Sequence, residues 1–180
     1  MVWEITAEEL LERYADGERN FAGIELIQSE GVPLDSSIDL EGAILRDINL
    51  RGAYLRQADL CGADLCGADL FGAYLERAWL DRAIVRDANL FSANLSWCNL
   101  TEADLRGTDL NHMNASHAIF CRAKLTPFEY AILIEADFRG ATPALHDLIC
   151  RGMNFIYKTI MFDGTVERGP YFGQWKSISK

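Results

Sequence analysis

An apolar residue recurs at every fifth position through the middle of the chain. In residues 56–80, RQADLCGADLCGADLFGAYLERAWL, leucine stands at positions 60, 65, 70, 75 and 80. Residues five apart point about 140° away from each other in an α-helix, and they point to opposite faces of a β-strand. A period of five therefore gives neither element a continuous apolar face.

Each unit of five reads as a short extended side followed by a corner. In most units an alanine precedes the leucine by two residues, which is the spacing of two side chains on one face of a strand. The two residues after the leucine, such as Cys61-Gly62 or Arg86-Asp87, are typical of a turn. Sides and corners in tandem wind into a coil, and stacked coils bury a column of leucines.

The pattern A-[D/N]-L-X-X, as in Ala63-Asp64-Leu65, resembles that of the pentapeptide-repeat proteins. Its register runs unbroken from Leu40 to Leu125, with Val85, Ala115 and Phe120 in place of leucine. The resemblance implies an all-β solenoid, namely a right-handed quadrilateral β-helix with about 20 residues per coil. Stacked coils would then lie about 4.8 Å apart, as paired strands do.

The inward positions of the repeat are expected to form a narrow, filled core that leaves no room for a substrate. Alanine fills most of the smaller inward positions. The exceptions are Ile38, Ile48, Cys98, Thr108 and Met113. Cys98 is therefore expected to be a buried, unreactive thiol.

The chain is expected to form a single domain over residues 1–180, with an N-terminal helical cap at 1–20. Thr6 and Glu9 have the spacing of a capping box, so the sequence predicts a helix over 7–16. This region resembles the cap of many cyanobacterial pentapeptide-repeat proteins. The helix would cover the open end of the leucine column, where strand edges otherwise invite pairing with another chain.

The β-helix itself is predicted over residues 21–162, with Phe21 and Leu26 as its first inward residues. It is interrupted by a loop at 27–37 and by an irregular coil at 126–145. Residues 163–180 are assigned to a closing turn and a tail. The sequence Met161-Phe162-Asp163-Gly164-Thr165 is similar to the family's closing turn, which is more usually M-P-D-G-T.

The irregular coil is predicted because a regular one would bury the side chain of Glu135. Strict counting after Leu125 would bury this residue, which is costly for a carboxylate without a partner. The alternative inward residues are Phe128, Leu133, Phe138 and Leu145. This spacing needs a compensating bulge near Thr142-Pro143, after which Phe155 and Ile160 would point inward.

Composition narrows the classes of protein. The sequence contains no run of about 18 apolar residues that could span a membrane. Its acidic N-terminus does not resemble a signal peptide. We therefore expect a cytoplasmic protein with free thiols. The net charge is -10 overall, but residues 1–37 carry -7 of it and residues 38–127 only -3. A continuous acidic face is therefore not expected on the repeat, and there is no basic excess for nucleic acid.

The outward residues do not suggest catalysis, a cofactor or a metal site. Acids on the stacked sides alternate with other residues, as in Asp69, Asn89 and Asp109, which does not suit paired acid–base catalysis. His112 and His117 are expected to be solvated at two corners. Cys66 lies between Arg46 and Arg86 in the stacking register, so its thiol either has a lowered pKa or is simply a small turn residue, which is the simpler role.

Aromatic residues give the strongest indication of function. Phe71 and Phe91 should stack at one corner, with Tyr54 and Tyr74 just past it on the adjoining side. We call these four residues the aromatic patch. Such clusters are enriched at protein interfaces, although the protein's own loop or tail would also account for them.

The sequence therefore predicts a non-enzymatic scaffold that contacts a protein partner or another copy of itself through the patch, without nucleic acid or a membrane. The alternative is a DNA-mimicking regulator of a type II topoisomerase, an activity that the family resemblance implies for some members.

Overall fold

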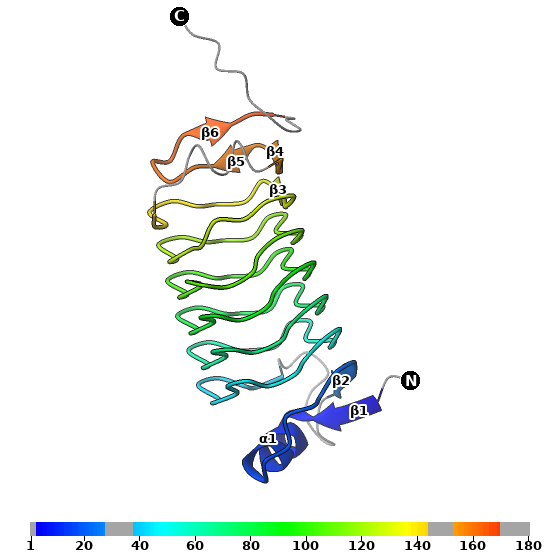
Figure 1. Cartoon of the computed structure of the whole chain (residues 1–180). Helices are drawn as coiled ribbons and strands as arrows, with labels where there is room; N and C mark the ends of the chain where they lie inside the picture. Colours follow the sequence, from blue (N-terminus) through cyan, green and yellow to red (C-terminus); the bar gives the residue numbers. More distant parts are fainter. Residues whose placement is uncertain (1–2, 28–37, 144–152, 170–180) are drawn as a thin grey trace, which may run out of the picture.

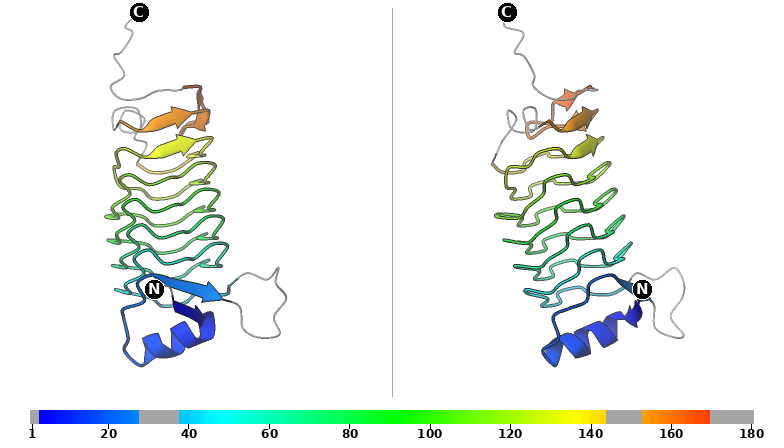
Figure 2. Two further views of the ribbon diagram at one scale, coloured as in Figure 1. Left: turned by 90° about the vertical axis from the view of Figure 1, so that its right-hand side faces the viewer. Right: turned by 45° about the vertical axis from the view of Figure 1, so that its right-hand side comes forward.

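The computed structural model describes residues 3–27, 38–143 and 153–169, which wind into a tall stack of coils (Figure 1). Residues 20 apart pair as parallel β-bridges through the regular part, as Asp59 does with Trp79 and Trp79 with Asn99. The predicted coil length is thus confirmed. Figure 2 shows from two further sides that the coils lie one above another with the N- and C-terminal segments at opposite ends.

Backbone hydrogen bonds hold each side of a coil to the coils above and below. The Leu60 N–H donates to the Trp79 carbonyl at 2.8 Å, and the Trp79 N–H donates back to the Ala58 carbonyl at 3.0 Å. Each side contributes one bridged residue, so the chain forms ladders of single bridges rather than long strands. These ladders satisfy the backbone groups that an apolar tube would otherwise leave without partners.

Each corner is a tight turn that the polar residue before the leucine stabilises. The Ala63 N–H donates to the Leu60 carbonyl at 3.0 Å across the corner, and Gly62 has a φ of +66°. The Asp59 carboxylate accepts a hydrogen bond from the Cys61 N–H at 3.0 Å. Aspartate and asparagine favour such contacts with the backbone two residues on, which explains why they precede the leucine so often.

The predicted core is confirmed over the regular coils. The inward leucines and alanines between Leu45 and Leu125 are at most 4% exposed, whereas Ile38 at the edge is only half-buried. Two polar residues at alanine positions find acceptors inside the tube. The Cys98 thiol donates to the Leu75 carbonyl at 2.8 Å, and the Thr108 hydroxyl donates to the Val85 carbonyl at 2.5 Å. Burial raises the pKa of the Cys98 thiol to about 12.

The N-terminal segment consists of strand β1 (Trp3–Thr6), helix α1 (Ala7–Ala15) and strand β2 (Ile24–Ile27). The Thr6 hydroxyl accepts a hydrogen bond from the Glu9 N–H at 3.2 Å, as the capping-box spacing predicted. The helix lies at the N-terminal end of the stack (Figure 1), and its Leu10 is fully buried. Strand β1 pairs in parallel with β2, which in turn bridges to Tyr54 of the stack. No helix in the described ranges is long and apolar enough to cross a membrane.

One coil near the C-terminal end is shorter than the others. Asn114 bridges to Ile132 and Ile119 to Asp137, so partners here are 18 residues apart. The coil is two residues shorter because its consecutive buried residues Leu125 and Phe128 are three residues apart instead of five. Leu133 and Phe138 are also buried, as predicted. The Glu135 side chain points outward and accepts a hydrogen bond from Lys158 at 3.1 Å. The irregular coil therefore keeps this carboxylate out of the core, as predicted.

The predicted phase of the last coil is wrong by one residue. Strand β3 (Ile132–Ile134) pairs with β4 (Phe155–Tyr157), so partners are 23 residues apart. Ile156 and Met161 are therefore buried, and the predicted inward residues Phe155 and Ile160 are partly exposed. The insertion between Thr142 and Phe155 is one residue longer than the predicted bulge. Of the predicted loop at 27–37, Ile27 instead belongs to strand β2, and residues 28–37 lie outside the described residues. Leu145 and most of the tail also lie outside them.

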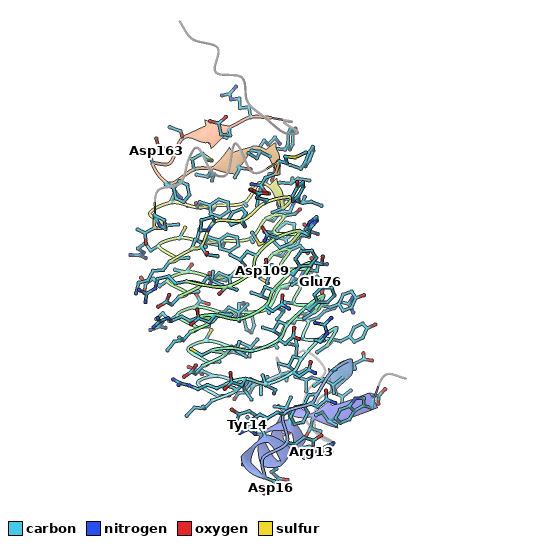
Figure 3. The ribbon with its side chains drawn as sticks, in the orientation of Figure 1. Arg13, Tyr14, Asp16, Glu76, Asp109 and Asp163 are labelled. Atoms are coloured by element: carbon cyan, nitrogen blue, oxygen red, sulfur yellow. The ribbon has the colours of Figure 1, made fainter. Side chains whose placement is uncertain are left out.

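A hairpin follows the last coil. Strand β5 (Thr159–Ile160) runs antiparallel to β6 (Val166–Glu167), in contrast to the parallel ladders below. The connecting turn has the Met161 N–H donating to the Thr165 carbonyl at 2.8 Å. Asp163, labelled in Figure 3, accepts a hydrogen bond from the Thr165 N–H at 2.9 Å. This change of direction takes the chain out of the stack where the family's closing turn was expected.

Candidate protein-interaction site

The aromatic patch forms two stacked pairs. The ring centroids of Tyr54 and Tyr74 are 4.7 Å apart with an interplanar angle of 8°, and those of Phe71 and Phe91 are 5.6 Å apart at 5°. Phe71 and Tyr74 are each 36% exposed, whereas Tyr54 and Phe91 are half-buried. The stacking follows from the 20-residue coil, because equivalent positions in successive coils lie directly over each other. Their role in binding stays a prediction.

Two arginines extend the patch, and sequence reasoning had not connected them with it. The Arg51 guanidinium lies 4.2 Å from the ring centroid of Phe71, while its Nη1 is 3.1 Å from an Asp69 carboxylate oxygen. The cation is thus held by a ring face and a carboxylate together. Arg51 and Phe71 are 20 residues apart, so the stacking register contained the signal.

The second arginine repeats this arrangement on the tyrosine pair. The Arg56 guanidinium lies 5.0 Å from the centroid of Tyr74, and its Nε is 3.1 Å from Glu76, which Figure 3 labels. Glu76 also accepts a hydrogen bond from Asn94 at 2.8 Å. The patch therefore presents aromatic rings beside paired arginines and carboxylates, a composition that suits a protein interface.

The phenylalanine pair continues upward into a longer column of rings. His112 lies 4.8 Å from Phe91 and 4.9 Å from Tyr130, measured between ring centroids. We call Phe71, Phe91, His112 and Tyr130 the corner column. His112 is exposed, as expected for a corner residue, and the shortened coil also places Tyr130 over one face of its ring. That contact depends on an 18-residue step, so strict counting by 20 misses it.

A second ring pair lies at another corner. His117 stacks on Trp97 with centroids 4.0 Å apart, and its Nδ1 is 3.4 Å from a Glu135 carboxylate oxygen. Trp97 is 57% exposed. His117 is thus packed between an indole and a carboxylate rather than surrounded by water, which corrects the expectation for this residue.

Several outward carboxylates form ion pairs with arginines. Arg46 contacts Asp64 at 2.6 Å, and Arg106 contacts Asp104 at 2.5 Å. The hydrogen bond from Arg106 holds the pKa of the Asp104 carboxyl below its usual range. Among the residues that the structure describes, no group of three or more His, Cys, Asp and Glu side chains is arranged to hold a metal ion.

The thiol of Cys66 is not activated. Burial, and then the neighbouring Asp64 carboxylate, raise its pKa above the ordinary value of 9.0, and these effects outweigh the nearby Arg46. The alternative of a lowered pKa, which the stacking register suggested, is therefore wrong. Asp64 forms an ion pair with Arg46, so the arginine stabilises the carboxylate more directly than it could stabilise a thiolate.

Cys61 is expected to react slowly with iodoacetamide at pH 8. Burial and the carboxylates of Asp59 and Asp81 raise its pKa to about 12, so its thiolate fraction should be roughly 10³-fold smaller than that of an ordinary thiol. Site-resolved mass spectrometry on a Cys150→Ser variant, with glutathione as the reference thiol, measures this. Alkylation of Cys61 as fast as that of glutathione would contradict the expectation.

The repeat in the sequence matches the family model described as pentapeptide repeats, with 8 copies over the overlapping segments 36–70, 48–87, 68–107 and 88–126. The chain belongs to the pentapeptide-repeat family. Proteins of this family form right-handed quadrilateral β-helices, which agrees with the 20-residue bridging seen here. No curated protein matches the sequence significantly.

Several solved structures of pentapeptide-repeat proteins are similar to this chain. A protein from the Arabidopsis thaliana thylakoid lumen is 23% identical, covers 66% of this chain and 79% of its own, and has a TM-score of 0.38. HetL of Nostoc sp. strain PCC 7120, involved in heterocyst differentiation regulation, is 27% identical and covers 91% and 100%, with a TM-score of 0.25. QnrB1, a plasmid-mediated fluoroquinolone resistance protein, is 17% identical and covers 78% and 71%, with a TM-score of 0.35. The family assignment rests on the repeat, because these TM-scores are low.

Proposed function

We propose that this pentapeptide-repeat protein is a non-enzymatic scaffold that binds a protein partner, or a second copy of itself, through the aromatic patch. The observation that carries this proposal is the stacking of Tyr54 on Tyr74 and of Phe71 on Phe91 at the surface of a rigid stack. Exposed aromatic groups of this kind cost solubility and are typical of interface hot spots.

The rigidity of the stack supports the same proposal. Each ring of the patch is attached to a corner or side that backbone ladders fix from above and below, as the Tyr74 N–H is fixed by the Ala53 carbonyl at 2.9 Å. A surface that is ordered before binding loses little conformational entropy when a partner docks. The stacked rings also hold one another, so little side-chain freedom remains to be lost.

Helix α1 has a supporting role in this proposal. It contributes Leu10 to the buried core at the N-terminal end of the stack, and Tyr14, labelled in Figure 3, donates a hydrogen bond to the Arg46 carbonyl at 2.9 Å. We infer that the helix closes this end of the right-handed β-helix against unwanted strand pairing. Partner binding would then be directed to the lateral surface.

The alternative, mimicry of DNA toward a type II topoisomerase, needs a long acidic surface. Several acids of the regular coils are instead paired with arginines, as in the contacts of Asp64 with Arg46 and of Asp69 with Arg51. This pairing favours a mixed-charge protein interface over a mimic of the phosphate backbone. A supercoiling assay with DNA gyrase tests the alternative, and potent inhibition by the intact protein would support it over the scaffold.

The double variant Phe71→Ser/Phe91→Ser is expected to abolish association while the fold is retained. Association is measured by sedimentation velocity for self-assembly and by capture from native cell lysate with mass spectrometry for a partner. Loss of this much buried aromatic surface should weaken binding by at least about 100-fold. This loss is expected because the variant removes both phenylalanine rings from the centre of the proposed interface.

The matched control is Trp79→Ser/Ile119→Ser, which removes two exposed apolar side chains from a different side of the coil. Trp79 and Ile119 are 44% and 40% exposed. The control should associate like the intact protein. Equal association by all three proteins would rule out the aromatic patch as the interface.

A further inference from the structure

A recess opens where the shortened coil leaves the regular stack. On one side of the coil the ladder runs through Asn49, Asp69, Asn89 and Asp109. Asp109, labelled in Figure 3, has no bridge to the next coil among the described residues, because the chain passes from Leu125 to Phe128 in three residues. This shortening of the coil leaves a cavity of about 330 Å³ beside the corner column.

The lining of this recess is aromatic with one carboxylate. Phe91, His112 and Tyr130 of the corner column line it, together with Phe128 from the shortened side. Glu129 is the one charged residue in the lining, and it has no ion pair within the described part of the chain. No arginine or lysine contributes to the lining, so the recess combines apolar rings with an uncompensated negative charge.

The backbone of Glu129 is fixed in this position. Its N–H donates a hydrogen bond to the side-chain oxygen of Asn111 at 2.7 Å, and its carbonyl accepts one from the His112 N–H at 2.9 Å. Tyr130 follows directly and stacks on His112 with an interplanar angle of 11°. Two consecutive residues on a corner with a fixed backbone, one acidic and one aromatic, therefore both line the recess.

The same combination already binds guanidinium groups elsewhere in this protein. Arg51 lies on Phe71 and contacts Asp69, as described above. At the N-terminal end, Arg13 lies 4.7 Å from the centroid of Trp3, while its Nε is 2.8 Å from Glu18. In each case one guanidinium meets both an aromatic ring and a carboxylate. At Tyr130 and Glu129 the ring and the carboxylate are present, and no arginine of the described residues contacts them.

We propose that this recess receives the guanidinium of an arginine side chain from the protein partner. The proposal rests on the proposed function and adds to it the chemistry of one partner residue. The guanidinium would contact the rings of the corner column and pair with the Glu129 carboxylate, which are the two interactions that hold Arg51 on the same column. The aromatic patch and the recess share Phe91, so one partner surface reaches both.

Binding of N-acetyl-L-arginine methylamide, followed by NMR shifts of the His112 and Tyr130 ring protons at pH 8, tests the proposal. We expect saturable shifts with the arginine compound and none with N-acetyl-L-citrulline methylamide, its neutral counterpart of similar shape. Glu129→Gln should weaken binding about tenfold, whereas Glu41→Gln, an equal charge change at an exposed corner of another coil, should not.

Three results would overturn the assignment of the recess to a guanidinium group. These are the absence of saturable shifts at His112 and Tyr130, equal binding of the citrulline compound, and unchanged binding by the Glu129→Gln variant. Tighter binding of free L-arginine than of the methylamide would instead indicate a metabolite site and would overturn the assignment to a partner side chain. These results are distinguishable from those of the Phe71→Ser/Phe91→Ser experiment, because arginine binding is measured on proteins that retain both phenylalanines, whereas that variant tests association through the patch.

Discussion

Replacing Phe138 by alanine is expected to lower the free energy of unfolding by about 3–5 kcal/mol. Phe138 is fully buried in the irregular coil. Its ring stacks on Phe120 with centroids 4.8 Å apart, and it also contacts Phe128 at 6.2 Å and Phe162 at 5.9 Å. The substitution would remove the ring that joins the last regular coil to the two irregular ones, and urea unfolding followed by circular dichroism measures the loss.

Phe71→Ala provides the matched control, since it removes the same atoms from a side chain that is 36% exposed. Its cost should stay below about 1.5 kcal/mol, because much of the ring already contacts water. A comparable loss of stability in both variants would contradict the central role assigned to Phe138. If the Phe138→Ala variant were as stable as the intact protein, that result would also contradict the role assigned to Phe138.

The regular coils could be predicted from the sequence because one rule governs every inward position. A tube built from five-residue units accepts a small residue and a leucine in fixed places, so Ala63 and Leu65 are buried by the same geometry as Ala93 and Leu95. The stacking of Phe71 on Phe91 followed from the same repeat. Each expectation depended only on the five-residue length of the repeat unit and the 20-residue length of the coil. A strongly periodic sequence makes both lengths reliable guides.

The irregular coils were only partly predictable, because their phase depends on the length of segments that break the repeat. The cost of burying Glu135 was enough to locate the shortening before Phe128. No similar constraint fixed the number of residues inserted after Thr142, and the one-residue error exchanged Phe155 for Ile156 in the core. A shift of one residue in extended chain always turns side chains to the other face.

The interaction site was incomplete in the sequence for a related reason. Contacts between long side chains cross from one unit to another, as when Arg51 reaches both Phe71 and Asp69. The period specifies where each Cα lies but not which way a flexible arginine extends. The regular repeat does not predict the recess, because the recess arises where the step from Leu125 to Phe128 is three residues instead of five.

Replacing Leu75 by alanine in the middle of the stack is expected to lower the free energy of unfolding by about 3–5 kcal/mol, the upper part of the range for such substitutions. Leu75 is 1% exposed. The cost depends on how far the surroundings can close on the cavity. Here the Leu75 N–H donates to the Asn94 carbonyl at 2.9 Å, and the Leu75 carbonyl accepts from Ala78 at 3.0 Å. The carbonyl also accepts from the Cys98 thiol at 2.8 Å, so the backbone is fixed from several directions.

Leu75→Met is the matched control, because it nearly conserves volume and should cost less than about 1.5 kcal/mol. If the coils on both sides are held apart by their ladders, the cavity in the alanine variant should persist and the difference between the two variants should be large. A small difference would mean that neighbouring coils move together to fill the space. That result would contradict the rigid stack on which the proposed pre-ordered interaction surface depends, since a tube that yields at Leu75 would not hold Tyr74 in one place.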